Sequence, residues 1–160
     1  ANYWKEKDAQ STKMPQEALK QAVEAYIHEN NTCALATAAG DFVRCTPVEY
    51  VYHKNCFWIF SEGGEKFYAL EKNKNVCLSV FDKYEGFGKL KGMQVTGIAA
   101  IVEPFSEEYT ELASVRKIPL EALKKMLHPM NLIRITPKKI EFINSEFKKE
   151  GADSRQVLHF

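Results

Sequence analysis

The sequence predicts a mainly β protein, an antiparallel barrel or sandwich of six to seven strands with peripheral helices. Three observations indicate this class. The β-prone runs follow one another directly and are joined by hairpin turns, a single short helix interrupts them after the third strand, and the other helical patterns lie near the two ends of the chain. A regular alternation of strands and helices is absent, so a parallel α/β fold is not expected.

The size and composition of the chain favour one domain spanning residues 1–160. With 45% hydrophobic and 27% charged residues, a chain of 160 residues can bury a stable core without disulfides or metal. We expect a helix over about 15–29, a barrel over about 31–143 and a tail over 145–160. The 22 basic and 21 acidic residues give a formal charge of +1, so a nucleic-acid partner is not expected.

The cysteines and the hydropathy pattern bear on the cellular compartment. Cys33, Cys45, Cys56 and Cys77 are widely spaced, form no CxxC pair, and lie in apolar β-prone runs. We therefore expect buried reduced thiols and no zinc site. No apolar stretch approaches the ~20 residues of a membrane span, and the first ten residues lack the apolar core of a signal peptide. These features predict a cytoplasmic protein without a membrane partner.

The helices and strands are expected in the following order. A 3.6-residue periodicity predicts a helix over 14–29, with Leu19, Val23, Tyr26 and Ile27 on one stripe. Further helices are expected after the turn at 63–64, over 106–116 and over 119–127. The predicted strands are 32–37, 42–52, 56–60, 76–81, 92–103, 131–136 and 139–143, the last two separated by a turn at 137–138.

The strand at 42–52 carries polar side chains on one face. Alternation places Arg44 and Thr46 on the face of Phe42, Val48 and Tyr50. Arg44 and Thr46 can reach one ligand from there, or they can form the solvent face of an edge strand. The proline at 47 cannot donate to a β-ladder, so it marks an edge or a bulge where the backbone can meet a ligand.

The segment FWIFSEGGEKFYALEK at 57–72 is a strand that turns through two glycines into an amphipathic helix. Such a junction can bind an anion through its amides, and Ser61 and Lys66 add a hydroxyl donor and a cation. The alternative is that both residues serve capping and solubility. In the helix, Phe67, Tyr68 and Leu70 are expected to face inward.

The loop at 82–91 and the strand after it contain two further features. Tyr84 and Phe87 are expected to be exposed in the loop, as a ligand lid or a subunit contact, or else as anchors on their own domain. In the strand at 92–103, Gln94 and Thr96 share a face. Small residues such as Gly97 allow another backbone or a flat ring to come close.

The motifs of several enzyme classes are absent from the chain. There is no GxxxxGK[ST], no GxGxxG, no GxSxG and no HExxH. These absences exclude the common phosphate-loop, dinucleotide-fold and hydrolase chemistries as starting points.

Three segments together resemble a known family. LATAAGDFVRCTPVEYVY, CFWIFSEGGEKFYALEKNKNVCLSVF and GMQVTGIAAIVE stand in the order and spacing of the pyridoxamine 5'-phosphate oxidase-like FMN-binding split-barrel family. The resemblance runs over about 31–143 and is nearest to the small nitroimidazole-reductase-like members. It implies an antiparallel split β-barrel and a homodimer with FMN at the interface.

The resemblance also implies which residues hold the cofactor. It assigns seven of them: Arg44, Thr46, Pro47, Val48, Ser61, Lys66 and Gln94. Arg44 and Lys66 are expected on the flavin phosphate, Ser61 as a donor to it, and Gln94 facing the flavin. The three remaining residues are expected along the ring. No catalytic side chain and no metal ligand are implied.

The implied function is an FMN-dependent oxidoreductase. It would transfer hydride or electrons between a reduced nicotinamide, NAD(P)H, and a small organic acceptor. Glu65 and Glu49 stand at positions where basic residues serve pyridoxamine 5'-phosphate oxidase, so that reaction itself is not expected.

Two alternatives remain open at this point. The first is a non-catalytic module that binds or senses flavin. The second is a split barrel that binds haem or a deazaflavin, for which the histidines are the available haem ligands. They are His28, His53, His128 and His159.

Overall fold

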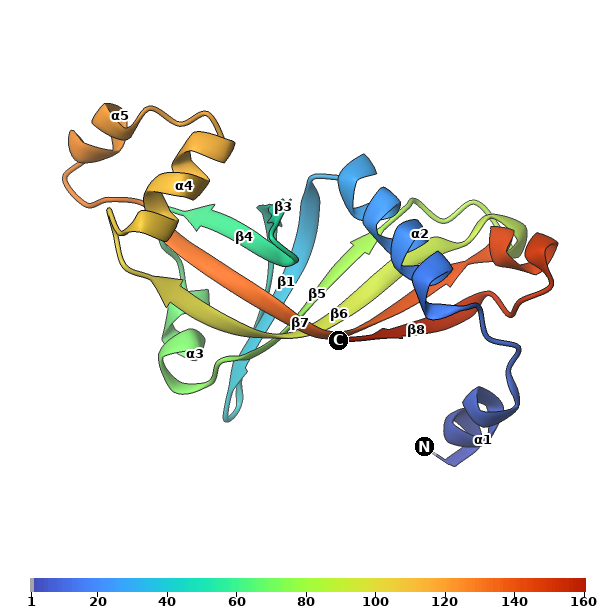
Figure 1. Ribbon diagram of the computed structural model, residues 1–160. Helices are drawn as coiled ribbons and strands as arrows, with labels where there is room; N and C mark the ends of the chain where they lie inside the picture. Colours follow the sequence, from blue (N-terminus) through green and yellow to red (C-terminus); the bar gives the residue numbers. More distant parts are fainter. Residues whose placement is uncertain (1) are drawn as a thin grey trace.

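The protein, seen in a computed structural model that describes residues 2–160, is a curled antiparallel sheet surrounded by helices (Figure 1). The strands are β1 (Thr32–Ala39), β2 (Phe42–Glu49), β3 (Val51–His53), β4 (Cys56–Ser61), β5 (Asn75–Phe81), β6 (Lys91–Val102), β7 (Asn131–Asn144) and β8 (Arg155–His159). Seven of them pair in the order β2-β1-β5-β6-β7-β4-β3, and β8 joins β7. The predicted mainly β, split-barrel class is confirmed.

The helices lie at the two ends of the sheet. They are α1 (Asn2–Gln10), α2 (Gln16–Glu29), α3 (Lys66–Lys72), α4 (Glu107–Val115) and α5 (Leu120–Lys124), with short 3-10 turns η1 (Phe87–Lys89) and η2 (Ser145–Glu150). In Figure 1, α2 lies over one end, α4 and α5 lie at the other, and α1 stands apart from the sheet. The predicted helix at 119–127 is shorter in the structure.

The main core lies between α2 and the concave face of the sheet. The predicted stripe Leu19, Val23, Tyr26 and Ile27 is buried there, because its spacing puts all four side chains on one helix face. A second cluster around Trp58 packs the far end of the sheet against α4 and α5. Ser106 caps α4, its hydroxyl accepting a hydrogen bond from the amide of Tyr109.

The prediction of two strands separated by a turn at 137–138 is wrong. The fourteen residues of β7 form one strand, and β6 pairs along it with a register shift between Thr96 and Gly97. Pro137 lies at this bulge, where its missing N–H interrupts no regular ladder. A Cβ on Gly97 would lie 2.8 Å from the Ile135 side chain and 2.9 Å from the carbonyl oxygen of Thr136. The small residue therefore makes room for β7, not for a flat ring.

The predicted run at 42–52 is divided at Tyr50. This residue is buried, its amide donates to the carbonyl of Asn31 (2.8 Å), and its hydroxyl donates to the carbonyl of Ile27 (2.6 Å). These bonds hold the chain at the point where it leaves β2 at one edge of the sheet and enters β3 at the other. The split of the barrel lies between these two edges.

The two ends of the chain contain structure that the sequence pattern did not indicate. Helix α1 has no buried residue, and the segment 145–160 contributes η2 and strand β8. The tail is polar, yet Gln156 is buried. Its side chain accepts from the amide of Met14 (3.0 Å) and donates to the carbonyl of Thr12 (3.0 Å). Hydrogen bonds of Gln156 therefore add to the apolar burial of Phe147, Ala152 and Leu158 in the main core.

All four cysteines are free, but they are not equally buried. Cys33 is buried, and this burial raises the pKa of its thiol to about 12. Cys45 is exposed, which makes the prediction of a buried thiol wrong at this position, because the outward face of the edge strand β2 is open. Within residues 2–160, the helices are too short or too polar to cross a bilayer.

Candidate functional site

The candidate site is the turn between β4 and α3. The hydroxyl of Ser61 donates to the carbonyl of Gly63 (3.0 Å) and accepts from the amide of the same residue (3.3 Å). The ammonium of Lys66 donates to that carbonyl too (2.6 Å). The structure therefore brings Ser61 and Lys66 together. Helix α3 has only seven residues, so the side chains of the turn matter more than the helix amides.

Lys66 is a buried cation without a counter-ion. Its exposed fraction is 5%, and among the described residues its ammonium forms no ion pair. Burial lowers the pKa of this group because the charged form loses hydration. A buried charge is costly unless it is paired. An anionic ligand would supply the pairing that the chain itself does not.

Arg44 reaches the same turn from β2. Its guanidinium forms an ion pair with Glu65, the residue immediately before Lys66. Both partners are substantially exposed, so the pair contributes little stability and can exchange. Arg44 therefore contacts the residue that precedes Lys66 in the chain.

Thr37 is a polar residue of this region that the sequence reasoning missed. It lies directly opposite Arg44 in the β1–β2 ladder and is 2% exposed. Its hydroxyl is the one buried side-chain donor or acceptor without a hydrogen-bond partner in residues 2–160. The alternation of β1 could have revealed it, because Thr37 shares the inner face with the apolar Cys33 and Leu35.

The other predicted residues of β2 lie along an open edge. Within the described chain, β2 pairs with β1 alone, which confirms the prediction that Pro47 marks an edge. The face assignment is also confirmed. Thr46 and Val48 are half-buried on the inner face, and Pro47 is exposed on the outer one. The unpaired side of this strand leaves backbone groups available to a ligand.

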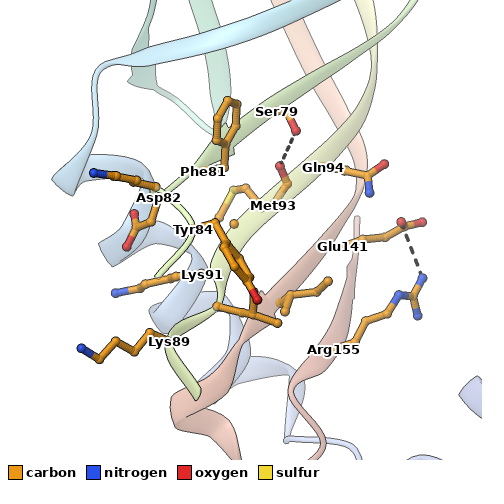
Figure 2. Close-up of a pocket in the computed structure, with 14 residues that line it drawn as sticks. Ser79, Phe81, Asp82, Tyr84, Lys89, Lys91, Met93, Gln94, Glu141 and Arg155 are labelled. Carbon is orange, nitrogen blue, oxygen red and sulfur yellow. Dashed lines mark hydrogen bonds and ion pairs between the residues drawn. The ribbon is translucent and has the colours of Figure 1, made fainter. Parts of the chain in front are cut away.

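Gln94 lies far from the turn within one chain. It is on the outer face of the sheet, whereas Arg44 is on the inner face. The ladder partners Pro47, Ala34, Ser79 and Gln94 follow one another across four strands. Three strand spacings put Gln94 about 14 Å from Pro47. A single chain therefore does not bring Gln94 to Lys66, and Gln94 lines a different cavity (Figure 2).

A hollow opens beside the Arg44–Glu65 pair. It is lined by residues of the β1–β2 hairpin and of α3, namely Ala39, Asp41, Phe42, Glu65 and Tyr68. The predicted inward position of Tyr68 is wrong. Its ring is exposed and packs edge-on against Phe42 (5.0 Å between centroids), while Lys72 donates to its hydroxyl (2.7 Å). The two rings form an aromatic wall next to the charged turn.

Glu49, at the other end of β2, has its own partner. Arg116 donates two hydrogen bonds to the carboxylate (2.6 and 3.0 Å), and these bonds lower its pKa. Glu49 lies five positions along the extended strand from Arg44, a distance of about 17 Å. Glu49 therefore does not offset the positive charge of the turn.

The fold and the candidate site together define a class of protein. A curled antiparallel sheet, an edge-strand arginine and a buried turn lysine describe a split barrel with a positively charged turn. Residues 19–144 match the family described as pyridoxamine 5'-phosphate oxidase. Because this match spans most of the chain, the protein belongs to that family.

Solved structures agree with this assignment at the level of the fold. HutZ, the haem storage protein of Vibrio cholerae, is 17% identical over 74% of this chain and 89% of its own, with a TM-score of 0.60. An FAD-binding protein of Mesorhizobium loti is 20% identical over 76% and 89%, with a TM-score of 0.59. A Bacteroides thetaiotaomicron protein proposed to act in 5-nitroimidazole antibiotic resistance is 14% identical over 76% and 81%, with a TM-score of 0.62.

No curated protein matches the chain. The identities to the solved structures are all low, so these likenesses show a shared fold and not a shared ligand. The fold is the split barrel that flavin- and haem-binding proteins use, and the predicted family resemblance is confirmed.

Proposed function

We propose that this protein is an FMN-dependent oxidoreductase that transfers hydride or electrons between NAD(P)H and a small organic acceptor. The observation that carries the proposal is the buried, unpaired ammonium of Lys66 in a turn that Arg44 also reaches. A phosphate dianion provides the counter-charge that Lys66 lacks and can compete with Glu65 for Arg44, and guanidinium and ammonium groups suit it in different ways.

The residues of the turn fit the phosphate end of such a cofactor. Lys66 would neutralise the charge of the phosphate from a buried position, and Arg44 can donate two hydrogen bonds to it. Ser61 lies next to Lys66, because both side chains donate to the carbonyl of Gly63. FMN, when bound, supplies the hydride or electron transfer, so the protein needs no nucleophile of its own. The open edge of β2, with Thr46, Pro47 and Val48, is proposed to orient the ring through backbone groups.

A second copy of the chain is proposed to complete the site. Gln94 is exposed on the outer face of the sheet and cannot reach the turn of its own chain. A homodimer that pairs these outer faces would bring Gln94 of one copy toward the β2 edge of the other. The cofactor would then lie between two copies, with its phosphate held by one of them.

The reaction of pyridoxamine 5'-phosphate oxidase itself is not part of the proposal. Positions 65 and 49 carry carboxylates, which pair with Arg44 and Arg116 respectively. Neither position therefore offers a cation to a second phosphate. The acceptor is therefore proposed to be an uncharged small molecule, such as a quinone or a nitro compound.

Haem binding is less well supported by the positions of the histidines. His28, His128 and His159 are exposed, and the half-buried His53 lies 3.4 Å from the carboxylate of Glu111. None of them faces the hollow beside the turn. Haem binding is therefore not proposed, and its appearance in the experiment below would contradict the proposal.

The visible spectrum of the protein after reconstitution with FMN and gel filtration tests the proposal. We expect retained oxidised-flavin bands that bleach anaerobically with NADPH and return with a quinone. The R44A/K66A variant should lose the bands, and the matched double variant R116A/K72A should keep them. A protein that stays colourless, or that takes up haem and shows a Soret band instead, would contradict the proposal.

A further inference from the structure

The hollow beside the Arg44–Glu65 pair has a volume of about 520 Å3 and lies next to the turn that is proposed to hold the FMN phosphate. Its residues come from the end of the β1–β2 hairpin and from the start of α3, which packs against that hairpin (Figure 1). Phe42, one of them, lies on the inner face of β2 together with Arg44. The proposed homodimer pairs the outer faces of the sheet, so it leaves this hollow uncovered.

Two aromatic rings form one wall of the hollow. The rings of Phe42 and Tyr68 lie 5.0 Å apart between centroids, with 68° between their planes. Lys72 holds the Tyr68 ring in place, because its ammonium donates to the hydroxyl (2.7 Å) and lies 4.0 Å from the ring centroid. A flat ring that stacks on one of the two side chains meets the other edge-on, and both arrangements are favourable between aromatic groups. The wall is therefore arranged for a planar aromatic group before one arrives.

The packing of helix α3 does not account for the position of Tyr68. The buried residues of this helix are Lys66, Ala69 and Leu70, whereas Tyr68 is 50% exposed. A large aromatic side chain that is exposed beside a hollow indicates a surface for contact with a ligand. One short helix thus carries the cation of the turn and the aromatic ring of the adjoining hollow.

The charged groups around the hollow favour an uncharged group over a further anion. The carboxylates of Asp41 and Glu65 line it. Glu65 pairs with Arg44, whereas Asp41 forms no ion pair among residues 2–160. A carboxylate repels phosphate but accepts hydrogen bonds from hydroxyl and amino groups, as acidic residues do from the ribose of dinucleotides. The hollow therefore suits a nucleoside whose phosphate lies outside it, toward Arg44 and Lys66.

We propose that the hollow binds the adenosine half of flavin adenine dinucleotide, FAD, while the flavin phosphate lies in the Lys66 turn. FAD is FMN joined through its phosphate to adenosine monophosphate, so the adenosine continues from the group that the turn holds. Lys66 and Arg44 face the two phosphates, the adenine stacks on Tyr68, and the ribose donates to Asp41. The volume of the hollow lies within the range of small-molecule pockets, about 300–1,000 Å3.

The inference rests on the proposed function, because it needs the flavin phosphate in the turn. FMN remains a ligand of the site, since it is the half of FAD that the turn holds, and the chemistry of the flavin ring is the same in both cofactors.

Calorimetric titration of the flavin-free protein with FMN and with FAD tests the inference. We expect FAD to bind about tenfold more tightly, which corresponds to one good aromatic contact. Tyr68→Ala should reduce this ratio to about one and leave the FMN dissociation constant within about twofold of the parent value. Tyr68→Phe keeps the ring and should keep the ratio. Tyr3→Ala is the matched control and should change neither constant, because Tyr3 is 66% exposed in α1, far from α3 (Figure 1).

The polar side of the hollow is tested by Asp41→Asn. This variant should bind FAD about threefold more weakly, as for one exposed hydrogen bond, and should bind FMN no more weakly than the parent.

The outcomes separate this inference from the proposed function. If FMN binds but FAD binds no more tightly, or if Tyr68→Ala weakens both flavins equally, the inference is overturned and the proposed function stands. If neither flavin binds, both are overturned. A KM for NADPH that rises in FMN-loaded Tyr68→Ala would assign the hollow to the adenosine of the nicotinamide donor and would overturn the inference as well.

Discussion

Charged residues lie at both ends of strand β2, but their charges are balanced at only one end. At one end, Glu49 and Arg116 form a pair with two hydrogen bonds, and the charges cancel. At the other end, Arg44 forms an ion pair with Glu65, and the neighbouring Lys66 is buried without an ion pair among residues 2–160. The Glu49 end is a neutral ion pair on the surface. The Arg44 end has an excess of positive charge.

This comparison shows what identifies an anion site in a chain of formal charge +1. The number of basic residues near a position says little, because exposed pairs form wherever long side chains meet. A buried cation without an ion-pair partner is unusual, and around Lys66 the carbonyl of Gly63 replaces only part of the lost hydration. The Lys66 turn is therefore the place where a bound anion changes the energy most.

The largest effect is expected from Lys66→Met, which removes the buried charge and keeps an unbranched side chain. FMN affinity should fall about 100-fold, as for truncation of one partner of a buried charge pair. The free energy of unfolding without FMN should rise by about 1 kcal/mol, because an uncompensated buried cation is lost. Flavin fluorescence titration and urea denaturation measure the two quantities. Lys72→Met on the exposed face of α3 should leave both unchanged, and an FMN affinity within twofold of the parent would refute the role of Lys66.

The pH dependence of FMN binding should follow the lowered pKa of Lys66. The free ammonium loses its proton at a lower pH than an ordinary lysine, and a bound phosphate raises its pKa again. Binding therefore takes up a proton above the lowered pKa, and affinity should fall by up to about tenfold per pH unit as pH rises through it. The titration runs from pH 7, where the phosphate is a dianion, to pH 9.5. Lys66→Arg should give a flat profile, since arginine stays charged; an identical slope in both proteins would exclude Lys66 as the titrating group.

A smaller effect of opposite sign is expected from Glu65→Gln. Removing the carboxylate releases Arg44 toward the phosphate, and FMN should bind about three- to fivefold more tightly, the range of one exposed ion pair. The same fluorescence titration measures it. If FMN binds more weakly to this variant, Glu65 positions Arg44 instead of competing for it.

The smallest effect on FMN binding is expected at Glu49, which forms an ion pair with Arg116 at the far end of β2. Glu49→Gln should change FMN affinity less than about twofold, because this position lies about 17 Å from Arg44. Thermal denaturation should show a loss of about 0.5 kcal/mol, as for an exposed pair. A change in FMN affinity as large as that of Glu65→Gln would show that the two ends of β2 act on one site.

Much of this site could be predicted from the sequence because it depends on local patterns. Alternation placed Arg44 on one face of β2 with Thr46 and Val48, and the two glycines after Ser61 marked the turn that carries Lys66. The Arg44–Glu65 pair could not be predicted in the same way, because it depends on how a hairpin meets a helix twenty residues later. The unpaired hydroxyl of Thr37 likewise appears only when the burial of its neighbours is known.

The fold likewise contains elements that local sequence patterns predict and elements that they do not. Stripes and alternation gave α2 and most of the strands, which bury apolar side chains at regular spacing. Pro137 suggested a turn because proline usually ends a strand, whereas a bulge opposite Gly97 accommodates it within β7. Strand β8 escaped prediction since its buried positions, Gln156 and Leu158, include only one apolar residue in a short polar tail.

The central claim is that the turn of Lys66 holds a phosphate group, and the ratio of FMN to riboflavin affinity tests it most directly. The two ligands differ by that phosphate alone. For the unmodified protein, fluorescence titration should give an FMN dissociation constant about 100-fold below that of riboflavin, and inorganic phosphate should compete with FMN. Equal affinities for the two flavins, with no effect of phosphate, would contradict the account.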